Sequence, residues 1–170
     1  MAVGLALLVL APVALNFRDS QVRQARVFDL MARKVVQSIG DRSWLVTDGL
    51  LDPHIRLAAR EMGKELHLLD LTRFNDTRLL RELSEQIDRM GLTNQTVRLK
   101  NQAELGLVPF LQEWMRMDPR VSQKLALMTL PDLWYGSDHV PVPYGAIFLG
   151  FSDMAAVDMD VVRQQNRALW

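Results

Sequence analysis

Three aspartates follow two short apolar runs of this sequence, and their placement suggests carboxylate chemistry. Asp48 and Asp52 come after the run 43–47, and Asp70 lies near the end of the run 66–71. If both runs are parallel strands, their carboxyl ends form the edge where ligands bind. Carboxylates that converge there could hold a divalent cation or act as a general base. The three aspartates are therefore candidate catalytic residues. The alternative is that Asp48 and Asp52 only stabilise a turn and a helix start.

A second group of candidate residues lies in the proline-rich stretch 130–144. Adjacent aromatic side chains followed by a glycine could form a lip that stacks on a sugar or holds a peptide. The same aromatic pair could instead fix a long loop onto the edge of the sheet, and this is the interpretation that we favour. The candidate ligand-binding residues are Asp132, Trp134, Tyr135, Asp138 and His139. We expect Asp132, Asp138 and His139 to lie at the carboxyl end of a third strand.

The residue types that are missing exclude several other chemistries. The chain has no cysteine, which excludes disulfides, thiolate metal sites and cysteine nucleophiles. Its three histidines lack the spacing of a zinc motif, and the standard phosphate-binding loops and the G-x-S-x-G elbow are absent. Lys plus Arg equals Asp plus Glu at 20 each, so no strong field favours nucleic acid. We predict no metal, no cofactor and no nucleic-acid partner.

The candidate residues must be positioned by an alternation of short apolar runs and helical patterns. Strands are predicted over 43–47, 66–71, 125–129 and 146–151. Helices are predicted over 52–63, from residue 75 or 76 to about 90, and over 102–117. Pro109 should kink the third of these helices, and Asp118-Pro119 should open a short fourth one. This rhythm is typical of a parallel sheet with helical crossovers. We therefore expect an α/β fold, a Rossmann-like three-layer domain with a small, mostly parallel sheet.

The amino-terminal part of the sequence differs sharply from the rest. Residues 1–17 carry no charged side chain. As a helix they would span roughly 25 Å, slightly less than the hydrocarbon core of a bilayer. We expect a transmembrane segment here, with a signal peptide and a buried core helix as alternatives. The lack of a basic start, and the uncapped helical pattern that ends at Trp170, indicate a piece of a longer protein.

We divide the chain into four parts. Residues 1–17 are the membrane segment, 18–40 an amphipathic linker helix, 41–156 the α/β domain, and 157–170 a C-terminal helix that continues in the parent protein. The linker helix has an apolar stripe beside a basic face. It could pack on the core of the domain, the interpretation that we favour, or lie along a bilayer surface.

The order of elements from Leu10 to Leu71 resembles that of bacterial multi-spanning glycosyltransferase-like membrane proteins, which are thought to use lipid-linked sugars. An Arg-bearing helix (18–34) follows an apolar segment, then comes a strand with an aspartate- and glycine-containing turn (44–52), a helix ending at Gly63, and a second strand (66–71). The resemblance implies that transfer chemistry belongs to a membrane-embedded half that this chain lacks. It also implies that the domain faces outward.

Together these observations predict a non-catalytic, extracytoplasmic α/β domain of a membrane protein of cell-envelope glycan assembly. Its expected partners are the membrane and a glycan or another envelope protein. We place it in the periplasm, although the basic residues after the apolar segment favour the cytoplasm by the positive-inside rule. The first alternative is a membrane-anchored enzyme that uses the three strand-end aspartates. The second is a structural linker between membrane helices and a helical repeat.

Overall fold

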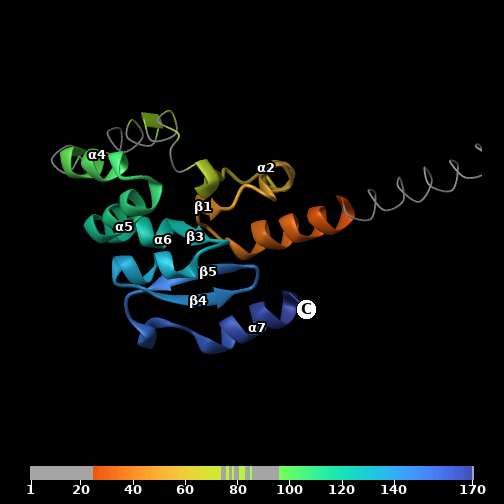
Figure 1. The fold of residues 1–170 in the computed structure, drawn as a ribbon. Helices are drawn as coiled ribbons and strands as arrows, with labels where there is room; N and C mark the ends of the chain where they lie inside the picture. Colours follow the sequence, from red (N-terminus) through yellow and green to blue (C-terminus); the bar gives the residue numbers. More distant parts are fainter. Residues whose placement is uncertain are drawn as a thin grey trace, which may run out of the picture.

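The computed structural model describes residues 25–73, 76, 78, 81–82, 85 and 96–169. The fold is α/β, with one five-stranded sheet in the order β2-β1-β3-β5-β4 (Figure 1). The strands are β1 (Trp44–Thr47), β2 (His67–Asp70), β3 (Leu125–Leu127), β4 (Val140–Tyr144) and β5 (Ile147–Phe151).

Helices precede, connect and follow these strands. The first described helix covers residues 25–38. The others are α2 (Asp52–Glu61), α4 (Thr96–Glu104), α5 (Leu107–Met117), α6 (Pro119–Lys124) and α7 (Met159–Leu169). Short 3-10 helices are η1 (Leu71–Arg73), η3 (Pro131–Leu133), η4 (Tyr135–Ser137) and η5 (Met154–Ala156). The helix predicted from residue 75 or 76 lies almost entirely outside the described residues.

The sheet is mixed, which corrects the prediction of a mostly parallel one. Strand β1 lies between β2 and β3 and is parallel to both, with Trp44 beside His67 and Leu125. Strand β5 is antiparallel to β3, and β4 is antiparallel to β5. Half of the strand pairs are therefore antiparallel, although β4 runs in the same direction as β1, β2 and β3.

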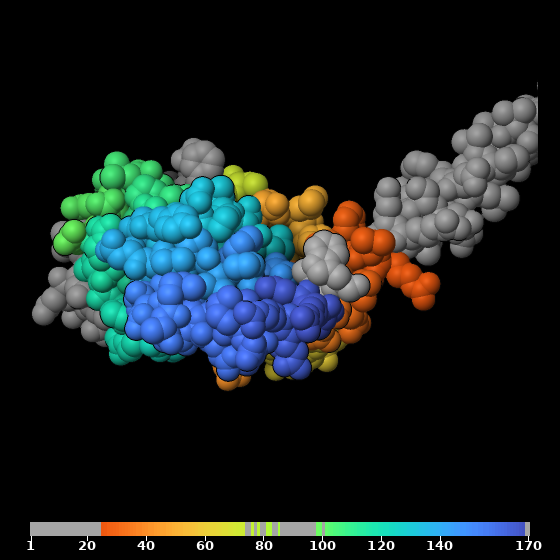
Figure 2. Space-filling model, turned by 90° about the horizontal axis from the view of Figure 1, so that it is seen from below, coloured from red at the N-terminus to blue at the C-terminus, as the bar shows by residue number. Residues whose placement is uncertain are grey.

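Strand β4 lies in the stretch that we expected to be a loop. Its prolines, Pro141 and Pro143, stand opposite Gly150 and Phe148 of β5, and β4 is the edge strand of the sheet, where a proline is tolerated. Gly145 has φ +60° and opens the tight turn of the β4–β5 hairpin. The Asn166 side chain of α7 binds the hairpin, accepting from the Gly145 amide at 2.7 Å and donating to the Pro143 carbonyl at 3.1 Å. Helix α7 thus lies along the hairpin on the face shown in Figure 2.

Two apolar clusters, one on each face of the sheet, confirm the three-layer arrangement. Trp44 and Val46 of β1 pack with α4, α5 and α6, whereas Leu45 packs with α2 and the helix 25–38 (Figure 1). This division follows from the alternation of side chains along a strand. Within the helix 25–38, Ala32 and Val35 are fully buried, so this helix packs on the core. Our favoured interpretation of its apolar stripe is confirmed.

The single helix predicted over 102–117 is instead two helices. The chain breaks between α4 and α5 at Gly106, whose φ of +120° is a conformation that a helix does not contain. Pro109 therefore falls in the first turn of α5. A proline there needs no amide partner and kinks nothing.

The predicted membrane segment, residues 1–17, lies outside the described residues. Among the helices that the structure does describe, none is both long and apolar enough to cross a membrane.

Candidate functional site

At the carboxyl ends of the strands, two of the predicted aspartates stabilise local turns. The Asp48 carboxylate accepts a hydrogen bond from the Leu50 amide at 3.1 Å. The Asp70 carboxylate accepts from the Thr72 amide at 2.8 Å and from the Thr72 hydroxyl at 2.6 Å. These contacts satisfy the backbone where each strand turns.

The third aspartate, Asp52, is buried at the start of α2, and its Oδ1 has no hydrogen-bond partner. Burial raises the pKa of Asp52, and the nearby charge of Asp70 raises it further, while a hydrogen bond with Thr47 opposes the shift. The backbone of Gly49 packs against Asp70, because a Cβ at Gly49 would lie 2.8 Å from Asp70 Oδ2. The carboxylates are therefore electrostatic neighbours.

This cluster does not have the arrangement of a metal site. Among the described residues, no group of three or more His, Cys, Asp or Glu is placed to hold a metal ion. None of the three aspartates lines the cavities described below. The turn alternative therefore accounts for Asp48, and Asp70 makes a turn contact of the same kind. The expected helix cap at Asp52 is wrong, because the N-cap of α2 is Leu51 and no side chain caps this helix, so Asp52 is left as a buried acid.

The predicted aromatic lip is divided between the core and the surface. Trp134 is fully buried and packs flat against Gly150, with its indole Nε1 donating to the Phe148 carbonyl at 3.4 Å. Tyr135 is exposed, and so is Asp132. Trp134 thus fixes the loop onto the sheet, as the favoured interpretation of the sequence predicts, whereas the exposed Tyr135 does not.

Asp138 and His139 lie at the opposite end of the sheet from Asp48 and Asp70. They directly precede β4, which runs in the same direction as β1, and therefore sit at the amino end of the strands. Our expectation that they join the carboxyl-end aspartates is wrong. The reason is that the stretch 128–139 crosses the sheet before β4 begins.

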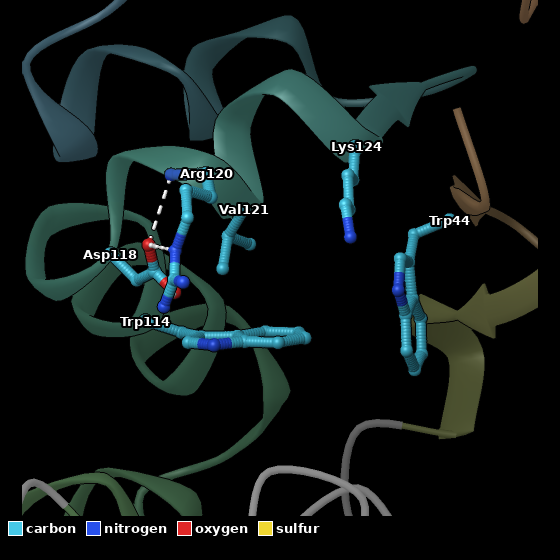
Figure 3. Close-up of a pocket in the computed structure, with 6 residues that line it drawn as sticks. All are labelled: Trp44, Trp114, Asp118, Arg120, Val121 and Lys124. Atoms are coloured by element: carbon cyan, nitrogen blue, oxygen red, sulfur yellow. Dashed lines mark hydrogen bonds and ion pairs between the residues drawn. The ribbon is translucent and has the colours of Figure 1, made fainter. Parts of the chain in front are cut away.

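The same amino end carries a cavity of about 220 Å³ (Figure 3). Trp44 is the first residue of β1, and Trp114 comes from α5. Helix α6 begins after Asp118, whose carboxylate caps it by accepting from the Arg120 amide at 3.0 Å. The lining residues are Trp44, Trp114, Asp118, Arg120, Val121 and Lys124.

Both carboxylate oxygens of Asp118 at this cavity accept hydrogen bonds from the Arg120 side chain. Arg120 donates from Nε to Asp118 Oδ1 and from Nη2 to Oδ2, both at 2.9 Å. This hydrogen bonding holds the pKa of Asp118 below its usual value. The carboxylate is therefore kept ionised and occupied, which makes it a poor general acid.

Two hydrogen-bond donors at the cavity have no partner. The Trp114 indole Nε1 is buried without an acceptor. The exposed Lys124 side chain makes no hydrogen bond or ion pair with the described part of the chain, although its charge helps to lower the pKa of Asp118, and Figure 3 shows its ammonium pointing between the two indoles. A buried donor without a partner is costly. Aromatic walls with free donors suit a ligand that has an apolar face and many acceptor oxygens, and favour binding over catalysis.

Sequence reasoning did not find this cavity. Trp44 was interpreted only as a strand residue and Trp114 as a core residue of a helix. The visible signal was the Asp118-Pro119 helix start, which fixes where α6 and Lys124 lie.

Comparison with protein-family models, curated proteins and solved structures gives no match to this chain. The resemblance to glycosyltransferase-like membrane proteins therefore remains a prediction from the order of elements in residues 10–71.

Proposed function

We propose that this chain is a non-catalytic binding domain for a glycan, within a membrane protein of cell-envelope glycan assembly. The observation that carries the proposal is the cavity between Trp44 and Trp114, with the unpaired Lys124 ammonium beside it (Figure 3). A sugar ring presents an apolar face for an indole and oxygens for the Lys124 ammonium. Among sugars, one with a carboxylate best matches the lysine.

The membrane and periplasmic parts of the proposal are supported by the sequence. Residues 1–17 are uncharged, and the order of elements after them resembles a family that works on lipid-linked sugars. The helix 25–38 begins soon after this apolar segment and packs on the sheet, so it would hold the domain close to the membrane.

The test is calorimetric titration of the full chain with two oligosaccharides of equal length, one neutral and one containing uronic acid. We expect the acidic oligosaccharide to bind. The variant Lys124→Gln should weaken that binding by about tenfold, because one charge-assisted hydrogen bond is lost. Arg60→Gln, an exposed cation of α2, is the matched control. If neither sugar binds, or if Lys124→Gln and Arg60→Gln bind alike, the proposed site is wrong.

A second candidate function, a membrane-anchored enzyme, is favoured by one observation. A buried acid with a raised pKa beside other carboxylates is a typical general acid or base, and Asp52 has those properties. NMR titration of the Asp52 carboxyl tests it, since the enzyme requires a pKa near neutrality. A pKa below about 5 would leave Asp52 ionised at working pH and unsuited to this role.

A further inference from the structure

A second cavity, of about 490 Å³, lies against the opposite face of α6. Pro119, Ser122 and Gln123 line it, whereas Arg120, Val121 and Lys124 face the cavity between the indoles. The second cavity also lies at the amino end of the parallel strands. Its charged and titratable lining residues are Arg42, Arg116, Asp138, His139 and Asp153.

Arg42 differs from the other lining residues of this cavity in having a buried donor atom without a partner among the described residues. It directly precedes β1, its Nε is buried, and that atom has no hydrogen-bond partner. Within the described part of the chain, its guanidinium forms no ion pair. Burial lowers the pKa of Arg42, although the nearby charges of Tyr144 and Asp41 partly offset this. The residue as a whole is only half-buried, and its guanidinium lines the cavity without a carboxylate partner from the described residues, which suits an oxyanion of a ligand.

Most of the other charged groups are already engaged. Arg116 donates to Glu113 and to the Gly136 carbonyl, both at 3.0 Å. Asp153 accepts from the Ala155 amide at 2.8 Å. A dianion such as phosphate would be repelled by the carboxylates of Asp153 and Asp138. The cavity therefore favours a ligand with a single negative charge.

Asp138 supplies a free carboxylate in the same cavity. Its side chain makes no hydrogen bond or ion pair with the described residues, and its backbone is left-handed, with φ of 61°. Asp138 precedes β4 and Arg42 precedes β1, three strand spacings apart in the sheet. That separation is roughly 14 Å between backbones, and the long arginine side chain spans part of it. Both residues line the cavity of about 490 Å³, a volume suited to a small molecule.

We propose that this cavity binds a small zwitterion, an amino acid or dipeptide, with the ligand carboxylate on Arg42 and the ligand ammonium on Asp138. The guanidinium matches a carboxylate in a bidentate geometry. The carboxylate of Asp138 accepts from the ammonium. This site is separate from the glycan cavity and does not depend on the proposed function.

The experiment uses chemical changes of the ligand rather than of the protein alone. The full chain is titrated by NMR with alanyl-alanine, with its C-terminal amide and with its N-acetyl form. We expect saturable binding of the free dipeptide. Each blocked form should bind about tenfold to a hundredfold more weakly, because each loses one charge-assisted contact.

Variants then assign each end of the ligand. Arg42→Gln should weaken binding of the free dipeptide but leave the affinity of the C-terminal amide unchanged, because the amide already lacks the contact between carboxylate and guanidinium. Asp138→Asn should weaken binding of the free dipeptide but leave the affinity of the N-acetyl form unchanged, because that form already lacks the ammonium contact. Asparagine tolerates the left-handed backbone at this position. Arg60→Gln is the control. The proposal is overturned if the three ligands bind alike, if none saturates, or if inorganic phosphate binds more tightly than the dipeptide. If Arg42→Gln fails to fold, Asp138→Asn and the blocked ligands decide the question.

Discussion

Substituting Gly150 by alanine tests whether Trp134 belongs to the core rather than to a binding lip. A Cβ at Gly150 would lie 2.2 Å from Trp134 Cε3 and 2.3 Å from Cδ2. The indole is fully buried, and its Nε1 donates to the Phe148 carbonyl of β5. The ring therefore has no free space into which it can move away from the new methyl group.

The expected cost follows from this geometry. Overpacking a well-packed core typically costs about 1–3 kcal/mol. Contacts this short, against a ring rather than the end of a flexible chain, place Gly150→Ala near the top of that range. Removing a glycine from a strand returns about 0.5–1 kcal/mol. The net loss in the free energy of unfolding should therefore be about 2 kcal/mol.

A double-mutant cycle, measured by urea denaturation, isolates the contact. Trp134→Leu alone should also destabilise the protein, because it opens a cavity in the core. In that background Gly150→Ala should cost almost nothing, since the ring that it strikes is gone. The coupling free energy should then be about 2 kcal/mol. Losses that add to within about 0.5 kcal/mol would refute the packing argument.

Two further predictions concern the aspartates at the strand ends. Gly49→Ala should destabilise the fold by about 2 kcal/mol in urea denaturation, because Gly49 has φ +80° and a Cβ would strike the Asp70 carboxylate; an unchanged midpoint would contradict this. Burial raises the pKa of Asp52 in the folded state above its usual value of 3.8. The folded state therefore binds this proton more tightly than the unfolded state does, and the resulting stabilisation is complete below pH 3.8 and is lost as the pH rises through the folded-state pKa. Asp52→Asn should therefore gain stability relative to the parent chain between pH 3.8 and neutrality, and a difference that does not vary with pH would contradict the assignment.

The sequence was sufficient to predict the elements whose signals are local. The apolar run 43–47 and the Asp52-Pro53 start correspond to β1 and α2. The Asp118-Pro119 pair opens α6 as expected. In each case a helix start or a short buried run decides the structure without help from distant residues.

The failures come from signals that only tertiary structure resolves. Pro141 and Pro143 indicate a loop in the sequence, yet both are compatible with an edge strand once β5 is beside them. The direction of β5 also decides which end of the sheet Asp138 occupies. Nothing in the local sequence specifies that direction, so the prediction placed Asp138 and His139 at the wrong end.

The candidate cavities show the same division. Trp44, Trp114 and Lys124 come from separate elements, and their meeting depends on how α5 and α6 pack on β1. By contrast, the turn roles of Asp48 and Asp70 involve residues two positions away, and for Asp48 the sequence offered that role as an alternative. Local capping can be read from a sequence, whereas a cavity between elements cannot.

The two proposed binding sites of this fold lie at an unusual edge of the sheet. In open parallel sheets the carboxyl ends of the strands carry the ligand site. Here the carboxylates at that edge serve turns or are buried, while three donors with no partner among the described residues lie at the amino end: Lys124 Nζ, Trp114 Nε1 and Arg42 Nε. Helix α6 separates them into two cavities, one aromatic and one charged. Because an unsatisfied buried donor costs stability, Trp114 Nε1 and Arg42 Nε are a cost to the fold at this edge, whereas the exposed Lys124 ammonium is the donor that a ligand can reach directly.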